Sequence, residues 1–353
     1  MKTRSFFRPR SARALLVAST LSLLLVACGG DDANGSASPV SIPSSSTPTP
    51  SALPTPTATP LPSSTPTSTP ASWTAAVAAM YDVATSIANC TSGTLKASVR
   101  TEVLARINAL RGLHGLPAVT YSDADNGQVD ASSLMMAANG QLSHTPPTNW
   151  LCYTATGSAG AGSSNLVGVW GTGMRFFSDD DFLGLWMTED GSASIGHRRW
   201  ILDPFLGKIS YGRVAQEQSG GYRADAATLK VFSFSAAPPV PSGIPSFIAY
   251  PYGNYPIRYF RAGDYLSFSV VSSATNKGAN AGVNFASATI TVSNGSTNLT
   301  VTDVTQDNQG YGLPNNVQWR VTGLQSNVSY TVRITGIAGA PQSSYQYMFK
   351  IVP

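Results

Sequence analysis

The segment 29–72 constrains the fold most, because it offers almost nothing that a globular core could bury. It contains no aromatic residue and no charged residue after Asp32, and Pro, Ser and Thr recur throughout. A chain of this composition stays extended and solvated. We therefore expect a tether over residues 28–72, with ordered structure beginning near Trp73. In polyproline conformation, at about 3.1 Å per residue, such a tether reaches on the order of 130 Å.

The first 27 residues are typical of an export signal. Five basic residues precede an apolar run over 14–27, which is too short for a permanent membrane span. Leu25-Val26-Ala27-Cys28 resembles a bacterial lipobox, and an ordinary signal peptide with a chance cysteine is the alternative. The lipobox predicts lipidation of Cys28 and thus a membrane anchor. The anchor would lie at the outer membrane if the cell is Gram-negative, and otherwise at the cell surface.

The charge of the chain argues against a nucleic-acid partner. There are 22 basic and 18 acidic residues, but five of the basic residues and none of the acidic ones lie in the signal, which leaves about −1 for the remainder. Proteins that bind nucleic acid need a basic surface. We therefore expect no nucleic-acid partner.

Two cysteines, Cys90 and Cys152, remain beyond Cys28. An even pair in an exported chain predicts one disulfide between them, with two free thiols as the alternative. No cysteine-rich spacing typical of a metal knuckle occurs.

A proline-rich stretch, 238–245, separates two regions with different hydrophobic periodicity. Before it, apolar residues recur at helical spacing in three segments, 99–110, 123–139 and 178–189. Two further runs, 209–214 and 229–234, are β-rich. Beyond it, apolar and polar residues alternate in 266–270, 317–322, 328–334 and 345–351. The pattern predicts an α/β domain over residues 73–240 and a small β-sandwich over residues 245–353. Leu324, Tyr330 and Val332 resemble the tyrosine corner of immunoglobulin-like and fibronectin type III modules.

The stretch 196–204 concentrates imidazole, guanidinium and apolar groups, and it contains one of only three histidines. Upstream, Ser178 and the three aspartates after it predict a capped helix that ends near Glu189. A short glycine-containing loop then returns the chain, so that His197 can meet Glu189. This pair is the first candidate for a functional site. His114, in a glycine-rich turn, is expected to be a solvated loop residue without a role.

The sequence Trp-Met-Thr-Glu at 186–189, followed by Gly-His-Arg-Arg-Trp-Ile-Leu-Asp-Pro at 196–204, resembles the CAP superfamily. This superfamily, also called the SCP domain, comprises the cysteine-rich secretory, allergen and pathogenesis-related proteins. The resemblance covers about residues 95–237, including Asn108 and Arg111 in the first helix. It implies an α-β-α sandwich fold.

The CAP cavity joins two histidines and two glutamates. By resemblance, His144 and His197 supply the imidazoles and Glu189 supplies one carboxylate, whereas Ser164-Asn165 stands where the family has Glu-Asn. A serine hydroxyl is a poor ligand for a divalent cation. His144, His197 and Glu189 could still hold zinc with an open water position. The alternative is a hydrogen-bonded polar cluster that only fixes the surrounding loops.

Motifs of common hydrolases are missing from the sequence, which has no Gly-X-Ser-X-Gly, no His-Glu-X-X-His and no P-loop. The lipobox and the tether predict a surface-anchored protein, and the CAP resemblance implies that it binds a lipid or sterol-like molecule, or an envelope partner, outside the cytoplasm. The first hypothesis is therefore a surface-anchored binding protein without catalysis. A metal-assisted hydrolase of peptides or cell wall is the second hypothesis, with Glu189 as ligand or general base. A purely structural envelope module is the third.

Overall fold

The computed structural model describes residues 72–189, 192 and 194–353. The predicted signal peptide, Cys28 and all but the last residue of the predicted tether therefore lie outside the described residues. Within the described part of the chain, no helix has the length and apolar character needed to cross a membrane. The first element is a short helix, α1 (Trp73–Ala79), and its N-cap Ser72 accepts a hydrogen bond from the Ala75 backbone N–H.

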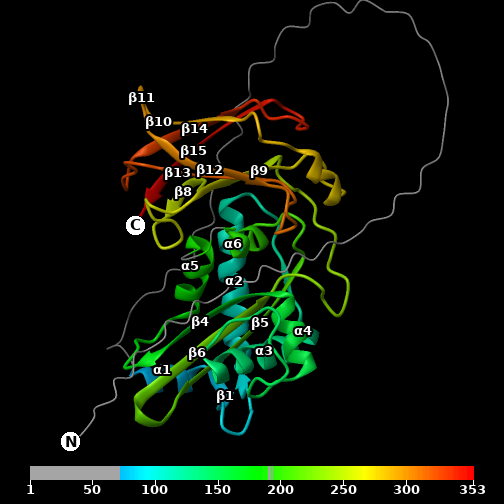
Figure 1. The fold of residues 1–353 in the computed structure, drawn as a ribbon, viewed down its shortest axis with the longest axis vertical. Helices are drawn as coiled ribbons and strands as arrows, with labels where there is room; N and C mark the ends of the chain where they lie inside the picture. Colours follow the sequence, from blue (N-terminus) through cyan, green and yellow to red (C-terminus); the bar gives the residue numbers. More distant parts are fainter. Residues whose placement is uncertain (1–71, 190–191, 193) are drawn as a thin grey trace, which may run out of the picture. The chain divides into compact units, whose positions relative to one another are not determined.

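A four-stranded sheet with the order β3-β5-β6-β4 forms the centre of the first region (Figure 1). Its strands are β3 (Thr120–Tyr121), β4 (Ser164–Thr172), β5 (Lys208–Glu217) and β6 (Tyr222–Lys230). The short 3-10 helix η2 (Ser219–Gly221) joins β5 to β6, and β6 runs antiparallel to both β5 and β4. β3 pairs in parallel with β5. The predicted run over 209–214 thus lies in the central strand β5, whereas the run over 229–234 only begins in the neighbouring strand β6, which ends at Lys230.

Helices cover both faces of this sheet. The helices are α2 (Ala97–Leu113), α3 (Asn126–Asn139), α4 (Ala155–Gly162), α5 (Asp179–Thr188) and α6 (Gly196–Ile201). Successive strand residues point to opposite faces, so Leu166 packs with the apolar residues of α3, whereas Val167 packs with those of α2 and α5. This arrangement confirms the predicted α-β-α fold.

Local sequence signals set several helix ends. Ser178 caps α5 by accepting a hydrogen bond from the Asp181 backbone N–H, and the Asp181 carboxylate accepts one from the Ser178 N–H in return. The predicted helix over 123–139 begins as a 3-10 turn, η1 (Asp123–Asp125), and continues as α3. It ends at Gly140, whose φ of 61° suits glycine.

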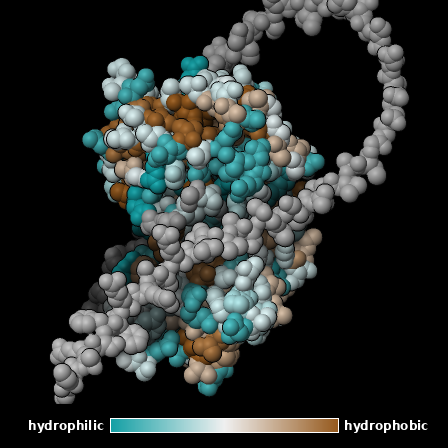
Figure 2. All heavy atoms as spheres, viewed as in Figure 1, coloured by the Kyte–Doolittle hydropathy of each residue, from teal (hydrophilic) through white to brown (hydrophobic). Residues whose placement is uncertain are grey.

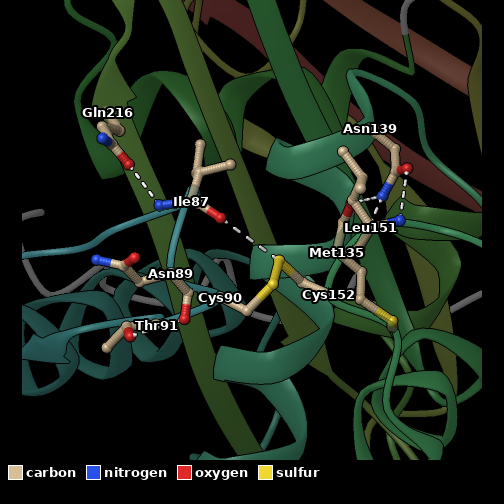
Figure 3. Close-up of a disulfide and its surroundings, with 9 residues drawn as sticks. All are labelled: Ile87, Asn89, Cys90, Thr91, Met135, Asn139, Leu151, Cys152 and Gln216. Carbon is tan, nitrogen blue, oxygen red and sulfur yellow. Dashed lines mark hydrogen bonds between the residues drawn. A yellow bond between two sulfur atoms is a disulfide. The ribbon is translucent and has the colours of Figure 1, made fainter.

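A disulfide joins Cys90 to Cys152 and confirms the predicted pairing (Figure 3). Cys90 lies in the loop of a small hairpin formed by β1 (Tyr81–Val83) and β2 (Thr94–Leu95), and Cys152 lies between α3 and α4. Beside it, the Ile87 backbone N–H donates a 2.7 Å hydrogen bond to the Gln216 side chain in β5. The bridge therefore ties the hairpin to the α3–α4 connection at the edge of the sheet.

Two facing sheets form the second region. Their orders are β11-β10-β14-β15-β8 and β12-β13-β9-β7. The elements are β7 (Phe247–Tyr250), β8 (Gly253–Pro256), β9 (Leu266–Val270), η3 (Gly278–Gly282), β10 (Thr289–Asn294), β11 (Thr297–Asn298), β12 (Val301–Asp307), β13 (Asn316–Val321), β14 (Ser329–Thr335) and β15 (Ser344–Val352). The rings of Phe268 in one sheet and Tyr347 in the other stack, with centroids 6.1 Å apart. The two sheets thus pack face to face as a sandwich.

The core continues from the first region into this sandwich. One cluster of buried apolar side chains includes Leu110 and Trp186 from the helices together with Tyr250 and Phe260 from the second region. In the sandwich itself, the Tyr330 hydroxyl accepts a 2.7 Å hydrogen bond from a backbone N–H five residues upstream, as a tyrosine corner does. Figure 2 shows that hydrophobic residues, in brown, also reach the surface over the C-terminal strands.

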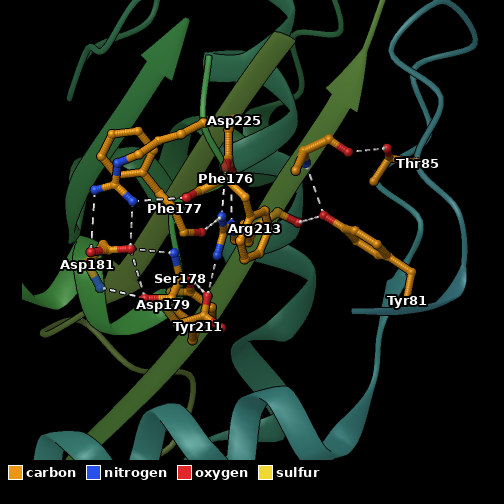
Figure 4. A network of polar contacts seen from close by, with 12 residues as sticks. Tyr81, Thr85, Phe176, Phe177, Ser178, Asp179, Asp181, Tyr211, Arg213 and Asp225 are labelled. Carbon is orange, nitrogen blue, oxygen red and sulfur yellow. Dashed lines mark hydrogen bonds and ion pairs between the residues drawn. The ribbon is translucent and has the colours of Figure 1, made fainter. Parts of the chain in front are cut away.

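A buried ion network fixes the start of α5 to the sheet (Figure 4). The fully buried guanidinium of Arg213 in β5 makes two hydrogen bonds, of 2.8 and 2.7 Å, to the carboxylate of Asp225 in β6. It also donates a 2.8 Å hydrogen bond to Asp179, the first residue of α5. The Tyr211 hydroxyl donates to the same Asp179 oxygen at 2.6 Å. The helix that leads to Glu189 is therefore anchored at its first turn.

Candidate functional site

Glu189 and His197 meet where α5 ends and α6 begins. Glu189 follows α5 with a φ of 58°, a left-handed conformation that turns the chain out of the helix. One of its carboxylate oxygens accepts a 2.7 Å hydrogen bond from the Arg198 backbone N–H, and the other lies 2.9 Å from His197 Nδ1. The Glu189 side chain is 1% exposed and that of His197 is 31% exposed. The predicted contact is present, with the carboxylate holding the imidazole from the protein interior.

His144 and His197 line one cavity of about 500 Å³. The Nδ1 atom of His144 is 2.8 Å from the Ala161 carbonyl oxygen, which can only accept, so this nitrogen carries the hydrogen. The Nδ1 atom of His197 faces a carboxylate, which selects the same tautomer. In their neutral forms both rings therefore keep Nε2 as a hydrogen-bond acceptor for a bound molecule.

Ser164 and Asn165, at the start of β4, also line the cavity. The Ser164 hydroxyl donates a 2.6 Å hydrogen bond to the Gly160 carbonyl oxygen. The Asn165 side-chain amide donates to the His197 carbonyl oxygen at 2.9 Å. Asn165 thus holds the first turn of α6, whereas Ser164 closes the end of α4.

Aromatic residues form another wall of the cavity. The remaining lining residues are Gly162, Ser192, Ser194, Gly196, Trp200, Phe232 and Tyr311. The rings of Trp200 in α6 and Phe232 after β6 stack, with centroids 4.7 Å apart. The cavity therefore combines two imidazoles with an apolar, flat surface.

Residues 104–231 match the family model of the cysteine-rich secretory protein family, CAP. The chain carries a CAP domain. The matched segment contains His144 and His197 and all the cavity-lining residues except Phe232 and Tyr311. Among solved structures, an outer surface protein from Borrelia burgdorferi is similar at 13% identity, with 39% of this chain and 95% of that chain covered and a TM-score of 0.26. No curated protein matches the chain.

The CAP domain does not assemble the three predicted metal ligands into one site. Within residues 72–189, 192 and 194–353, no group of three or more His, Cys, Asp or Glu side chains is placed to hold a metal ion. Both carboxylate oxygens of Glu189 are already bonded, and the Ser164 hydroxyl is bonded to a backbone carbonyl. Two imidazoles are fewer ligands than zinc takes from proteins. The described donor set thus does not fit a resident zinc ion, and Glu189 positions His197.

The two arginines after His197 connect the CAP domain to the β-sandwich. The Arg198 guanidinium lies 3.7 Å from the centre of the Tyr250 ring and donates a 3.0 Å hydrogen bond to the Met187 carbonyl oxygen. The buried Arg199 side chain donates to both carboxylate oxygens of Asp307, each at 2.9 Å. The motif therefore serves two purposes, because its histidine faces the cavity and its arginines hold the second region.

The structure corrects the prediction for His114. This residue ends α2 and is buried, with Nδ1 2.9 Å from the Ala249 carbonyl oxygen and Nε2 3.0 Å from the Tyr255 hydroxyl. Burial lowers the pKa of His114 to about 3, and the nearby Arg111 and Arg198 act in the same direction. The glycine-rich turn indicated an exposed residue, but a segment about 135 residues further along the chain covers it.

Sequence reasoning also missed Tyr311, which comes from the sandwich and lines the CAP cavity. It lies in the connection between β12 and β13, about 114 positions after His197, and no local pattern marks it. The same holds for Phe232, for which the sequence predicted only a place in a β-rich run. Trp200 belonged to the recognised motif, although its role in the cavity wall was not predicted.

Proposed function

We propose that the CAP domain binds a small amphipathic, lipid-like molecule and does not itself catalyse a reaction. The composition of the cavity carries this proposal. Its volume of about 500 Å³ lies in the range of about 300–1,000 Å³ typical of small-molecule sites. The stacked rings of Trp200 and Phe232 suit an apolar body. The Nε2 atoms of His144 and His197 suit a hydroxyl or protonated carboxyl group that donates a hydrogen bond.

The metal-assisted hydrolase gains no support from the arrangement of these side chains. Its general base would be Glu189, whose carboxylate is nearly inaccessible and already bonds His197 and the Arg198 backbone. A base must reach the proton that it removes, directly or through one water. Binding therefore fits the described residues better than hydrolysis does.

The proposal predicts that Trp200→Ala weakens binding of a lipid probe at least about tenfold, equivalent to about 1.4 kcal/mol. The reason is the loss of the flat apolar surface that Trp200 contributes to the cavity. The measurement is a titration of the purified full-length chain with dehydroergosterol, and separately with cis-parinaric acid, followed by the fluorescence of the probe itself.

Trp170→Ala is the matched control, because Trp170 is also a partly buried tryptophan but does not line the cavity. Thermal unfolding of each variant shows whether it is folded. Equal affinities in folded Trp200→Ala, Trp170→Ala and wild-type proteins would contradict the proposal. Absence of binding by either probe, with capture of an envelope component at a different surface, would favour the envelope-partner hypothesis instead.

We also propose that the protein is exported and held at the cell envelope by a lipid on Cys28. The apolar run, the lipobox and the long proline-rich segment after it support this. A Cys28→Ser variant is expected to move from the membrane fraction to the soluble fraction on ultracentrifugation, since a serine hydroxyl cannot take the thioether-linked lipid. Unchanged membrane association of Cys28→Ser would rule out Cys28 as the anchor.

A further inference from the structure

The connection between β12 and β13 lies against the CAP motif. The carboxylate of Asp307, at the end of β12, accepts both hydrogen bonds from Arg199, which also donates to the Gln309 carbonyl oxygen at 3.1 Å. The same carboxylate accepts a 2.9 Å hydrogen bond from the Gln309 backbone N–H, which closes the turn. A buried cation in the CAP domain therefore organises this loop of the sandwich.

The loop approaches α6 so closely that one position requires glycine. Gly312 has a φ of 60°, and a Cβ atom added there would lie 2.1 Å from the Arg199 carbonyl oxygen. Neither the conformation nor the space suits another residue. The loop is consequently held at two points, by the Arg199 side chain and by backbone contact with the same residue.

This anchorage places Tyr311 in the wall of the cavity. Its ring lies beside Gly196, where an added Cβ atom would be 3.6 Å from two ring carbons. The Arg199 guanidinium lies 5.6 Å from the centre of the same ring. Tyr311 is nevertheless 39% exposed, a large exposed fraction for an aromatic residue with these contacts. The exposed part of Tyr311 is therefore available to a ligand in the cavity.

A second residue of the sandwich contacts the aromatic wall. The ammonium group of Lys277 lies 4.8 Å from the centre of the Trp200 ring and pairs with the buried carboxylate of Asp203. Trp200 is thus stacked on Phe232 and also contacted by a cation from the second region. Two separate segments of the sandwich therefore reach residues of the cavity.

We infer that the β-sandwich completes the ligand site of the CAP domain, with Tyr311 as a residue that determines which apolar molecule the cavity holds. The inference rests on the proposed function. The sandwich is then part of the binding machinery, in addition to any role as a spacer. A ligand with an apolar body long enough to extend from the imidazoles to the Tyr311 ring gains a contact that the CAP domain alone does not provide.

The test uses the full-length chain and the two lipid probes named above. Tyr311→Ala is expected to weaken the affinity for the better-bound probe about tenfold without changing the melting temperature, because the side chain is partly exposed. Tyr311→Phe is expected to bind as the wild type does, since the ring makes the contact. A loss in Tyr311→Phe as large as that in Tyr311→Ala would contradict the role of the ring.

Two control variants test whether weaker binding comes from loss of the Tyr311 ring. One tests for an effect of changing the loop, and the other for an effect of removing any exposed tyrosine. Gln309→Ala keeps the carbonyl group that Arg199 binds and removes only an exposed side chain of the same loop. Tyr222→Ala removes another tyrosine that is 39% exposed but lies outside the cavity lining. Both variants are expected to bind the probe with the affinity of the wild type.

The outcomes distinguish this inference from the proposed function. If Trp200→Ala weakens binding while Tyr311→Ala behaves like Gln309→Ala, the inference is overturned and the proposed function stands. If neither probe binds the wild-type chain, or Trp200→Ala has no effect, both are overturned together. Weaker binding in both Trp200→Ala and Tyr311→Ala, with unaffected controls, supports both.

Discussion

Replacing Arg213 with alanine is expected to lower the free energy of unfolding by about 3–5 kcal/mol. The substitution leaves the carboxylate of Asp225, which is fully buried, without its cation, and removes one partner of Asp179. Burial already raises the pKa of Asp225, and the guanidinium opposes that rise. Without Arg213, Asp225 must either take up a proton or remain charged in the interior, and both alternatives destabilise the folded state.

Urea unfolding followed by circular dichroism measures this effect. Arg175→Ala is the matched control, because Arg175 also pairs with an aspartate of α5, Asp181, but its side chain is 61% exposed. A solvated pair of this kind contributes at most about 1 kcal/mol. If Arg213→Ala lowered the free energy of unfolding no more than Arg175→Ala does, the network would have no special part in holding α5 on the sheet.

The network is relevant to the cavity because α5 connects the two. Asp179 is the first residue of this helix, and Glu189, which holds the His197 ring, follows its last residue. Trp186 in the same helix donates a 3.1 Å hydrogen bond to the Leu166 carbonyl oxygen, next to Asn165 in β4. The position of the imidazole thus depends on contacts at both ends of α5 and on the neighbouring strand.

Local patterns in the sequence predicted the parts of the site that are set by short-range structure. The Ser178 cap, the end of the helix at Glu189 and the return to His197 all lie within about 20 residues, so spacing alone indicated their contact. The fold of the first region followed from the recognised motif. The disulfide followed from the number of cysteines, because only two remain beyond Cys28.

Contacts between the two regions could not be predicted in this way. Arg199 and Asp307 are 108 residues apart, and each looks like an ordinary charged residue in its own segment. The contact of Glu189 with His197 was predicted, but the second bond of its carboxylate, to the Arg198 backbone N–H, was not, and Glu189 does not line the cavity. Such features depend on which surfaces pack together, and periodicity carries no information about that.

His114 gives the second large effect, a loss of stability in mild acid. Its pKa of about 3 in the folded chain lies below its usual value of 6.5, chiefly because burial disfavours the charged ring. The unfolded chain therefore binds a proton more readily, and the stability due to the neutral ring is complete above about pH 6.5 and falls as the pH drops toward 3. From these two pKa values, protonation of His114 alone is expected to lower the free energy of unfolding by about 2 kcal/mol between pH 8 and pH 5.

The matched variant is His114→Gln, whose amide can donate to the Ala249 carbonyl oxygen and accept from the Tyr255 hydroxyl without titrating. The free energy of unfolding of both proteins is measured by urea at intervals from pH 8 to pH 5. His144 and His197 are present in both, so the difference between the two curves isolates His114. The variant is expected to lose less stability than the wild type on acidification, and parallel curves would show that His114 is not held neutral in the interior. Because the partners of this ring belong to the second region, a steeper wild-type curve would also show that the second region covers His114 in the folded protein.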